Sequence, residues 1–453
     1  MKKLPRLTLG ERGTTGVEKM PILSRNGRKL GVGAIVLLGV SAAAITAAHA
    51  GGFAVREQSA YYQGMSFAGA AAGNELSSMF WNSAAAAAAP GMNSESHFAL
   101  ILGDSEITAT DPLTVGPFTY GAQSGGISDP AVVPASYGNY QISDRLFLGI
   151  AINSPAGLTT KPDDTSWVGS FIAQKAKVFT ANANPTLAYK LTDTLTVGAG
   201  VQVQYTQFKF DRNVTADLQK ASIDTDDYGV GFTAGLIWQP LPHTQIGLGY
   251  RSGISTELEG DLTVPTAGGP LTFDTQANEF DSPDLLTLSI RQGVTDRLTA
   301  YGSVEWQQWS NLETLTFDSG LPANPSFDLN WDDGWFFALG LEYAYTPDWT
   351  VRAGIAYELS PIDETRSVFL PDNDRLWLSA GATHKLTENA TIDLAYTHIF
   401  VKDAPISRDG SVETGLGPVD FTLDAEAETS VDIVSASFKY KWGGAERELE
   451  PLK

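Results

Sequence analysis

The sequence predicts an all-β membrane protein, in which 14 antiparallel strands form an outer-membrane β-barrel with an N-terminal hatch plugging the lumen. Three observations predict this fold. The N-terminus has the pattern of an export signal, the later segments alternate apolar and polar residues, and six short polar turns recur at intervals of 41 to 54 residues. The charged fraction of the 453-residue chain is 18%, below the roughly 25% of a soluble domain.

The first 50 residues are expected to be a signal peptide that is cleaved after Ala50. A basic segment precedes the apolar run 30–46, and the small-residue sequence Ala48-His49-Ala50 follows it. This order is typical of secretory signals, whereas a membrane anchor, the alternative, needs a longer apolar run. Translation could begin at Met1 or at Met20, because a basic segment also follows Met20.

The exported part of the chain is strongly acidic. Eight of the 30 Lys and Arg residues and two of the 52 Asp and Glu residues lie in the first 50 positions, which leaves a net charge of about −28 for the rest. Nucleic acids bind basic surfaces, so no nucleic-acid partner is expected. The chain also has no Cys, and a closed barrel with fully paired strands can hold an exported fold together without disulfides.

The segment 284–306 shows the alternation that predicts the strands. Leu286, Leu288 and Ile290 alternate with polar residues, and a short polar break leads into a second alternating run that ends at Trp306. A period of two residues is typical of a strand with one apolar face. After residue 50 no apolar run approaches the roughly 20 residues of a spanning helix, so we expect the apolar faces to contact lipid.

The spacing of the short turns predicts the number of strands. Each interval contains an outgoing strand, a long polar loop and a returning strand, and the segment before the first turn adds another pair. Seven pairs make 14 strands, and short turns on one side with long loops on the other are typical of outer-membrane barrels. A soluble propeller is the alternative, but no blade motif recurs. The turns are centred on Asp144, Asp193, Pro242, Asp296, Asp348 and Asn389.

Aromatic residues flank these short turns and predict an interfacial girdle at that end of the barrel. They are Tyr140, Tyr189, Trp238, Tyr343, Tyr345, Trp349, Tyr440 and Trp442. Two segments, 145–152 and 335–343, are apolar on both faces. Their inner faces could line an apolar ligand path or pack against a plug, and the two interpretations are compatible.

The domain boundaries follow from where the alternation begins and ends. Residues 51–96 show no alternation and contain many small residues together with several aromatics, which predicts a compact hatch rather than a disordered arm. Residues 97–442 are expected to form the barrel, and residues 443–453 a C-terminal tail.

Four stretches resemble the FadL-type outer-membrane transporters of long-chain fatty acids and other hydrophobic compounds. They are GGFAVREQSAYYQGMSFAGAAAGNE (51–75), SPAGLTT with SWVGSFIAQKAK (154–160 and 166–177), NPTLAYKLTDTLTVGAGVQVQY (184–205) and LPDNDRLWLSAG (370–381). The resemblance spans about residues 51–442 and implies a 14-stranded barrel with a hatch. The chain departs from the family pattern at Ser83, where the family usually has Pro, and at Ser170, where many relatives have a basic residue.

The resemblance implies uptake of long-chain fatty acids or similar compounds by capture at the outer loops, passage to a deeper apolar pocket, hatch movement and lateral exit through the barrel wall. Because Pro cannot donate to a strand ladder, an interrupted third strand is the expected place of the wall gap. The candidate ligand-binding residues are Phe53, Trp167, Val168, Phe171, Lys175 and Lys177, and the candidates for the wall gap are Gly149, Pro155 and Gly157.

The expected partners are a hydrophobic ligand (a long-chain fatty acid or an aromatic hydrocarbon), lipid and lipopolysaccharide of a Gram-negative outer membrane, and the barrel-assembly machinery, with the chain as a monomer. A general diffusion porin and an outer-membrane lipase or esterase are the alternatives. No catalytic residue, metal ligand or cofactor is expected. The four His residues after residue 50 are isolated in sequence, and the segment around Ser66 lacks the second Gly of a nucleophile elbow.

Overall fold

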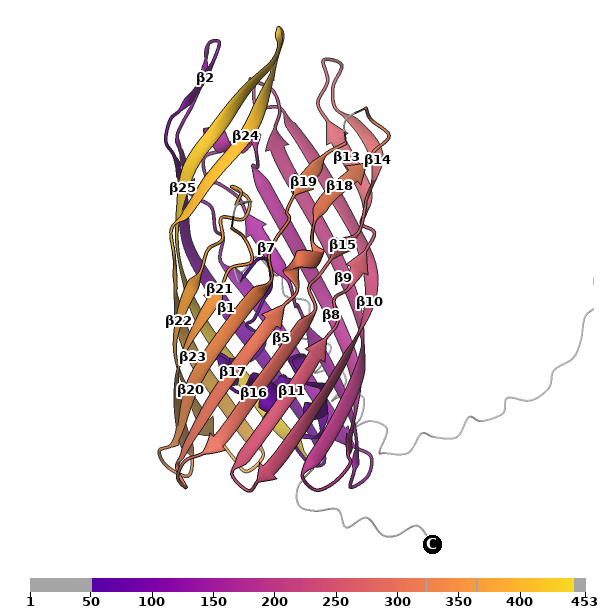
Figure 1. The fold of residues 1–453 in the computed structure, drawn as a ribbon, viewed down its shortest axis with the longest axis vertical. Coiled ribbons are helices and arrows are strands. Elements are labelled where there is room, and N and C mark those ends of the chain that lie inside the picture. Colours follow the sequence, from indigo (N-terminus) through magenta and orange to yellow (C-terminus); the bar gives the residue numbers. More distant parts are fainter. Residues whose placement is uncertain (1–50, 323, 364–365, 444–453) are drawn as a thin grey trace, which may run out of the picture.

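The computed structural model describes residues 51–322, 324–363 and 366–443, and the strands of this part close into a barrel (Figure 1). The expected signal peptide (1–50) and all of the expected tail after Gly443 lie outside the described residues. No helix among the described residues is long and apolar enough to span a membrane.

Fourteen long strands form the wall, which confirms the predicted barrel. Each strand pairs antiparallel with its neighbours, and pairing of the last strand with the first closes the sheet from Met92↔Trp442 to Ala109↔Ala425. The wall strands are β1 (Met92–Ala109), β5 (Ala131–Gln141), β6 (Leu146–Asn153), β8 (Lys175–Lys190), β9 (Leu195–Asn213), β10 (Lys220–Leu241), β11 (Thr244–Arg251), β16 (Leu285–Gly293), β17 (Leu298–Gln307), β20 (Gly334–Ala344), β21 (Trp349–Leu359), β22 (Arg375–Lys385), β23 (Ala390–Val401) and β25 (Gly417–Trp442).

The two ends of the barrel differ as the sequence predicted. The six short turns lie together at one end, the lower end of Figure 1, and the long loops form short additional strands at the other end. These are β2 (Leu113–Val115), β3 (Phe118–Tyr120), β4 (Gln123–Gly126), β7 (Gly157–Thr160), β12 (Ser255–Thr256), β13 (Glu259–Val264), β14 (Leu271–Ala277), β15 (Phe280–Asp281), β18 (Thr314–Asp318), β19 (Ser326–Asp328) and β24 (Ala404–Thr414), with the 3-10 helices η4 (Val168–Phe171) and η5 (Trp309–Asn311).

The alternation in the sequence corresponds to the two faces of the wall. On β16, Leu288 and Ile290 are exposed on the outside, whereas Ser289 is buried on the lumen side. β25 behaves in the same way, with Phe438 exposed and Ser437 buried. The outer surface is therefore apolar, as lipid contact requires. Six of the predicted girdle aromatics are exposed beside the short turns: Tyr140, Tyr189, Trp238, Tyr343, Tyr345 and Trp349.

The hatch fills the half of the lumen nearer the short turns. It consists of α2 (Ala60–Gln63) and the 3-10 helices η1 (Ala70–Ala72), η2 (Leu76–Phe80) and η3 (Ser83–Ala87), which are almost entirely buried. β1 begins at Met92, so the barrel starts before the boundary at residue 97 expected from the sequence. The inner faces of the two-faced segments contact the hatch: a side chain at Gly149 would touch Met79, and Phe336 lies 3.7 Å from the Arg56 guanidinium.

Ser83, where Pro was expected, gives the hatch a direct bond to the wall. Its hydroxyl donates to the Thr233 hydroxyl at 2.6 Å. The preceding Asn82 caps η3, because its side chain accepts from the Ala84 amide and its Nδ2 donates to the Leu236 carbonyl at 2.9 Å. A Pro side chain could not form the hydroxyl bond, so the departure from the family pattern is matched by a local contact.

Two wall glycines allow the hatch backbone to approach the wall. A methyl group on Gly354 of β21 would overlap the backbone of Met65. On the neighbouring strand, a Cβ at Gly381 would lie 2.8 Å from the Gly64 Cα atom. Side chains on the hatch cannot relieve these overlaps, because the contacts are made by its main chain.

We predict that Gly354→Ala destabilises the seated hatch by roughly 1–3 kcal/mol, the usual cost of overpacking. Proteolysis of the folded protein in detergent, followed at cleavage sites in residues 51–91, measures this effect. Gly302→Ala is the matched control, since a Cβ there would meet its nearest neighbour, the Ile290 side chain, at 3.4 Å. Equal protease resistance of the two variants would contradict the prediction.

Candidate functional site

An outer pocket with a cavity volume of about 620 Å³ lies among the loops and strand ends at the long-loop end. Its wall is mainly apolar and aromatic, and it comes from segments that are far apart in the sequence. The apolar lining includes Phe171, Phe210, Ile223, Leu262, Phe327 and Phe369. Such a surface can accept an apolar ligand before it enters the barrel.

Two arginines also line the outer pocket. Arg212 stands at the end of β9, with Glu413 as its electrostatic neighbour. Arg408 is on β24, where its Nε donates to the Arg366 carbonyl at 2.9 Å and Asp328 acts on its charge. A guanidinium presents several donors in a planar fork that matches a carboxylate. The outer pocket therefore combines an apolar wall with cations that suit an acidic head group.

A second, inner cavity lies deeper in the barrel and is lined entirely by apolar side chains. Its volume is about 30 Å³, about the share of liquid volume that one water occupies. Phe53 lines it, as the sequence interpretation expected, and its ring lies 4.7 Å from Trp309 and 5.5 Å from both Phe280 and Trp331. Phe53, near the start of the hatch, thus forms one wall of this cavity.

Three aromatic rings separate the outer pocket from the inner cavity, because Phe210, Phe327 and Phe369 line both. The centroid distances are 4.7 Å between Phe210 and Phe327, 6.0 Å between Phe327 and Phe369, and 6.1 Å between Phe210 and Phe369. Rotation of these side chains would join the two spaces into one apolar path.

The barrel wall is interrupted between β6 and β7, at residues 154–156. β5 pairs with β6 only from Ser136 to Gln141, and no ladder among the described residues joins β5 to β7. The Thr180 side chain takes the place of ladder bonds there, accepting from the Ala156 amide at 2.9 Å. Pro155 and Gly157, two of the expected wall-gap residues, lie at this interruption.

The hatch covers the interruption with its own backbone. The Val55 amide donates to the Pro155 carbonyl at 2.9 Å, and the Gly157 amide donates to the Phe53 carbonyl at 2.9 Å. Gln58 adds a side-chain bond, from Nε2 to the Ser154 carbonyl at 2.7 Å. The segment that contributes Phe53 to the inner cavity is therefore the same segment that closes the wall.

Of the other expected site residues, one lines the outer pocket, two are buried in the loop core, and one lies within a continuous strand of the wall. Phe171 lines the outer pocket, and its ring lies 4.7 Å from Tyr120, whereas Trp167 and Val168 are buried beneath it in the loop core. Gly149 lies inside the continuous ladder of β6, opposite Asn139 and Thr186, away from the interruption.

Lys175 and Lys177 lie on the face of β8 opposite the inner cavity. They alternate with Ala176 and Val178, which line that cavity, and successive side chains of a strand point to opposite faces. The Lys177 ammonium lies 5.8 Å from the ring of Phe179 on the same face. The cations that line a pocket are thus the arginines of the outer pocket rather than these lysines.

A polar network joins the N-terminal end of the hatch to the wall. Arg56 forms ion pairs with Glu305 at 2.8 Å and with Glu358 at 3.5 Å. The Gly52 amide donates to an Asp372 carboxylate oxygen at 3.0 Å. Asp372 belongs to the LPDNDRLWLSAG stretch, so the structure gives that stretch a role in holding the start of the hatch.

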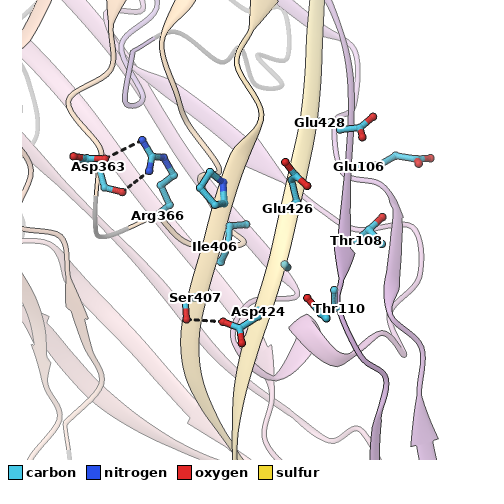
Figure 2. Close-up of a pocket in the computed structure, with 13 residues that line it drawn as sticks. Glu106, Thr108, Thr110, Asp363, Arg366, Ile406, Ser407, Asp424, Glu426 and Glu428 are labelled. Carbon is cyan, nitrogen blue, oxygen red and sulfur yellow. Dashed lines mark hydrogen bonds and ion pairs between the residues drawn. The ribbon is translucent and has the colours of Figure 1, made fainter.

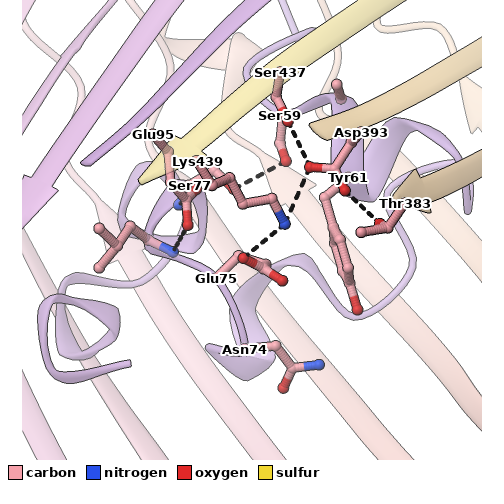
Figure 3. Close-up of polar contacts among 12 residues, drawn as sticks. Ser59, Tyr61, Asn74, Glu75, Ser77, Glu95, Thr383, Asp393, Ser437 and Lys439 are labelled. Atoms are coloured by element: carbon pink, nitrogen blue, oxygen red, sulfur yellow. Dashed lines mark hydrogen bonds and ion pairs between the residues drawn. The ribbon is translucent and has the colours of Figure 1, made fainter. Parts of the chain in front are cut away.

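A second polar network holds the middle of the hatch (Figure 3). Lys439 on β25 lies 2.9 Å from Glu75 of the hatch and 3.0 Å from Asp393 on β23. Glu95 on β1 accepts from the amides of Leu76 and Ser77 at 2.8 and 2.9 Å. Since both networks join the hatch to several strands, removal of one contact alone leaves the others in place.

A further pocket of the outer end, with a volume of about 1070 Å³, is lined mainly by polar residues and differs from the apolar outer pocket (Figure 2). Glu106, Asp424 and Glu426 contribute carboxylates, and Arg366 pairs with Asp363 at 3.3 Å at its rim. Among the described residues no group of His, Cys, Asp or Glu side chains is arranged to hold a metal ion. An acidic, solvent-open surface of this kind does not favour an apolar or anionic ligand.

Sequence reasoning missed the pocket residues of β9, although a signal was present. In the segment QFKFDRN, Phe208 and Phe210 alternate with Lys209 and Asp211. This pattern puts two aromatics on one face, and the structure shows that this face lines the cavities. Phe327 lies in the three-residue strand β19 and Phe369 in a loop, so neither belongs to a run long enough for alternation to identify it.

Comparisons with known proteins agree with this architecture. Residues 41–442 match the family described as "Outer membrane protein transport protein (OMPP1/FadL/TodX)". Outer membrane protein P1 of Haemophilus influenzae is 30% identical over 311 residues, covering 59% of this chain and 66% of the relative, just under two thirds. The long-chain fatty acid transport protein of Salmonella typhi is 25% identical over 351 residues, covering 69% and 77%. A crystal structure of a Pseudomonas aeruginosa FadL homologue shares the fold, with a TM-score of 0.77 and 24% identity, covering 86% and 100%.

We predict that the seated hatch weakens as the pH rises from about 4.5 through 7, because of Glu57. Both carboxylate oxygens of Glu57 are buried without a hydrogen bond, and burial raises its pKa from 4.5 to about 7. Among its charged neighbours Arg56 and Arg375 oppose this shift, and Glu358 adds to it. The folded state therefore binds more protons than the unfolded state between these values, and stability is lost as the pH rises.

The urea midpoint in detergent at pH 5.5 and pH 8 measures this effect. Of the roughly 3 kcal/mol that a shift of about 2.5 pKa units represents, roughly 2 kcal/mol is lost between these two pH values. Glu57→Gln should reduce the pH dependence, and the part that remains is assigned to Glu75, whose pKa burial raises to about 8. Glu426→Gln, an exposed carboxylate of the outer end, is the control and should keep it. A wild-type midpoint that rises between pH 5.5 and 8 would show that the sign is wrong.

Proposed function

Because the chain belongs to the OMPP1/FadL/TodX family of outer membrane transport proteins, we propose that it takes up long-chain fatty acids or similar hydrophobic compounds across the outer membrane. The family consists of transporters rather than enzymes. One observation carries the proposal for this chain: an apolar outer pocket and an apolar inner cavity bounded by the hatch are lined by the same three aromatic rings.

The apolar pockets suit a hydrophobic cargo, which a water-filled pore does not stabilise. Each methylene moved out of water contributes about 0.8 kcal/mol, so a long acyl chain is held strongly by an apolar surface and poorly by water. The inner cavity offers only apolar side chains, whereas the arginines of the outer pocket can hold a carboxylate. A fatty acid fits both parts, and a neutral aromatic hydrocarbon fits the apolar part.

We propose four steps. Cargo binds in the outer pocket, the rings of Phe210, Phe327 and Phe369 rotate, and the inner cavity widens as Phe53 moves. Displacement of Phe53 pulls on the backbone bonds that its segment makes to Pro155 and Gly157. Loss of those bonds would open the wall at residues 154–156 and let the cargo leave sideways into the bilayer.

A general diffusion porin is the alternative that this arrangement disfavours. Steady ion flow needs an open lumen, and in this chain the hatch occupies the lumen and is held to the wall by buried ion pairs. A lipase or esterase lacks support as well, because Ser66 bonds to the hydroxyl of Ser379 and not to a His side chain.

The outward lysines suggest a further partner of the same proposal. Lys177 and Lys209 pair across β8 and β9, and Lys209 forms an ion pair with Asp224. The aromatic rings of Phe179 and Tyr205 lie two or more residues nearer the bilayer centre on the same face. Cations just beyond an outer row of aromatic residues can bind the phosphates of lipopolysaccharide. We also expect the barrel to be a monomer and to be inserted by the barrel-assembly machinery.

We predict saturable binding of oleate to the purified protein in detergent, weakened on the order of tenfold by Phe53→Ala, since an aromatic contact pair contributes roughly 0.5–1.5 kcal/mol beyond its area burial. Arg212→Ala should weaken oleate binding and leave toluene binding unchanged. Fluorescence or calorimetric titration measures both. Lys175→Ala with Lys177→Ala is the matched control and should bind oleate like the wild type, because both lysines face outward.

The outcomes separate the candidate functions. Binding of toluene but not of oleate would keep the transporter and replace the fatty acid by a neutral hydrocarbon. Absence of saturable binding for both ligands, together with steady ion conductance in a planar bilayer, would favour the porin and reject the proposal.

A further inference from the structure

Arg251, at the end of β11, is a buried cation without a counter-ion in the described part of the chain. Its residue is 4% exposed, and both terminal guanidinium nitrogens lack a hydrogen-bond partner. None of the ion pairs between described residues involves it, in contrast to Arg56, Arg352 and Arg375. Its guanidinium lies 4.8 Å from the ring centroid of the hatch residue Phe80.

Such a group needs an anionic or polar occupant beside it. A guanidinium cannot release its proton in a protein, so Arg251 cannot avoid its charge by becoming neutral. Burial of an unpaired charge is strongly unfavourable, and a ring face compensates only a small part of it. The two free nitrogens can form a forked pair with a carboxylate, a geometry that a single water cannot match.

Further unpartnered polar atoms surround the same place. The Tyr137 hydroxyl acts electrostatically on Arg251 and lies close to Asn153, both of whose side-chain polar atoms have no partner. Asn153 pairs in register with Asn182 of β8, whose Oδ1 is also unpartnered. These unpartnered groups are thus connected to Arg251 through Tyr137, and to one another through the pairing of β6 with β8.

The hatch contributes to this group of residues. Tyr137 donates to the Gln58 carbonyl at 3.0 Å, and the Gln58 Oε1 atom has no partner. The Gln58 Nε2 atom donates to the Ser154 carbonyl at the wall interruption. The polar group of residues therefore stands beside the place where the hatch backbone closes the wall, and it stands apart from the arginines of the outer pocket.

We propose that Arg251, with Asn153, Asn182 and Gln58, forms a buried anion site that receives the carboxylate head group of the cargo next to the wall interruption. This inference rests on the proposed function. The acyl chain of a bound fatty acid would occupy the apolar side of the path, and its carboxylate would pair with the guanidinium of Arg251. A free inorganic anion could pair with Arg251 in the same way, and it would occupy the site when no cargo is bound.

The amides make the site selective for an acceptor. The unpartnered Asn153 Nδ2 group can donate to an anion. The unpartnered Oδ1 atoms of Asn153 and Asn182 can accept from a water, because the Tyr137 hydroxyl already donates to the Gln58 carbonyl. A neutral alcohol or a hydrocarbon of the same length gains no charged pair there. The site thus separates acids from neutral cargo at the exit, independently of capture outside.

The test compares oleate with oleyl alcohol, which has the same chain length and no charge, on wild type and Arg251→Gln. We expect oleate affinity to fall on the order of tenfold in Arg251→Gln, the effect of losing a charged hydrogen-bonded pair, with oleyl alcohol affinity unchanged. Arg251→Lys should restore part of the preference for the acid. Arg297→Gln, an exposed arginine in a short turn, is the matched control and should bind both ligands like the wild type.

Two more measurements keep the outcomes distinct. Compact migration in unheated SDS gels establishes that each variant is folded, and titration with bromide replacing oleate tests the inorganic source. Competition between bromide and oleate in wild type but not in Arg251→Gln would support one shared site. If Arg251→Gln lowers the affinities for oleate and oleyl alcohol equally, or lowers neither, the inference is overturned and the proposed transport function is unaffected. If none of the ligands binds to the wild type, the proposed function itself is rejected.

Discussion

The structure depends on one constraint: a backbone that crosses a bilayer must satisfy its own polar groups. Pairing of β25 with β1 meets this constraint by closing the sheet, and the closed sheet in turn fixes which residues face lipid and which face the lumen. The wall departs from it at residues 154–156, where β7 no longer continues β6. There the hatch supplies the missing partners through Phe53 and Val55. In the proposed mechanism, opening the wall and moving the hatch are therefore a single event.

The hatch combines two kinds of contact with different consequences. Its main chain packs closely on wall glycines. Its ion pairs with Glu305 and Lys439 and its backbone hydrogen bond to Asp372 hold the seated position from several strands. Removal of one partner of a buried ion pair strongly destabilises the structure, because the other charge stays buried without a partner. Intact pairs, however, contribute little net stability. They specify the seat without making it permanent, which suits a plug that has to yield when cargo displaces Phe53.

Much of this architecture could be predicted from the sequence, because the outer surface imposes a period of two on every strand. The two faces of each strand follow from that period. The number of strands follows from the spacing of the short turns, and the girdle follows from the aromatic residues beside those turns. The cations of the path could not be found in the same way. Lys175 and Lys177 are near Trp167 in sequence, but the register of β8 turns them outward. Arg212 and Arg408 meet in the outer pocket from strands about 200 residues apart, a closeness that only the closed barrel creates.

Arg251 could not be identified from the sequence either, because the feature that distinguishes it is the lack of a counter-ion among the described residues. The sequence presents it as one more arginine at the end of a strand. Only the complete set of neighbours shows that other buried arginines have carboxylates and this one does not. A cation left unpaired beside the exit, with apolar rings on the way to it, divides the work along the path. In the proposed mechanism the rings would select for an apolar cargo. The charge near residues 154–156 would select for the head group, where the cargo would leave for the membrane.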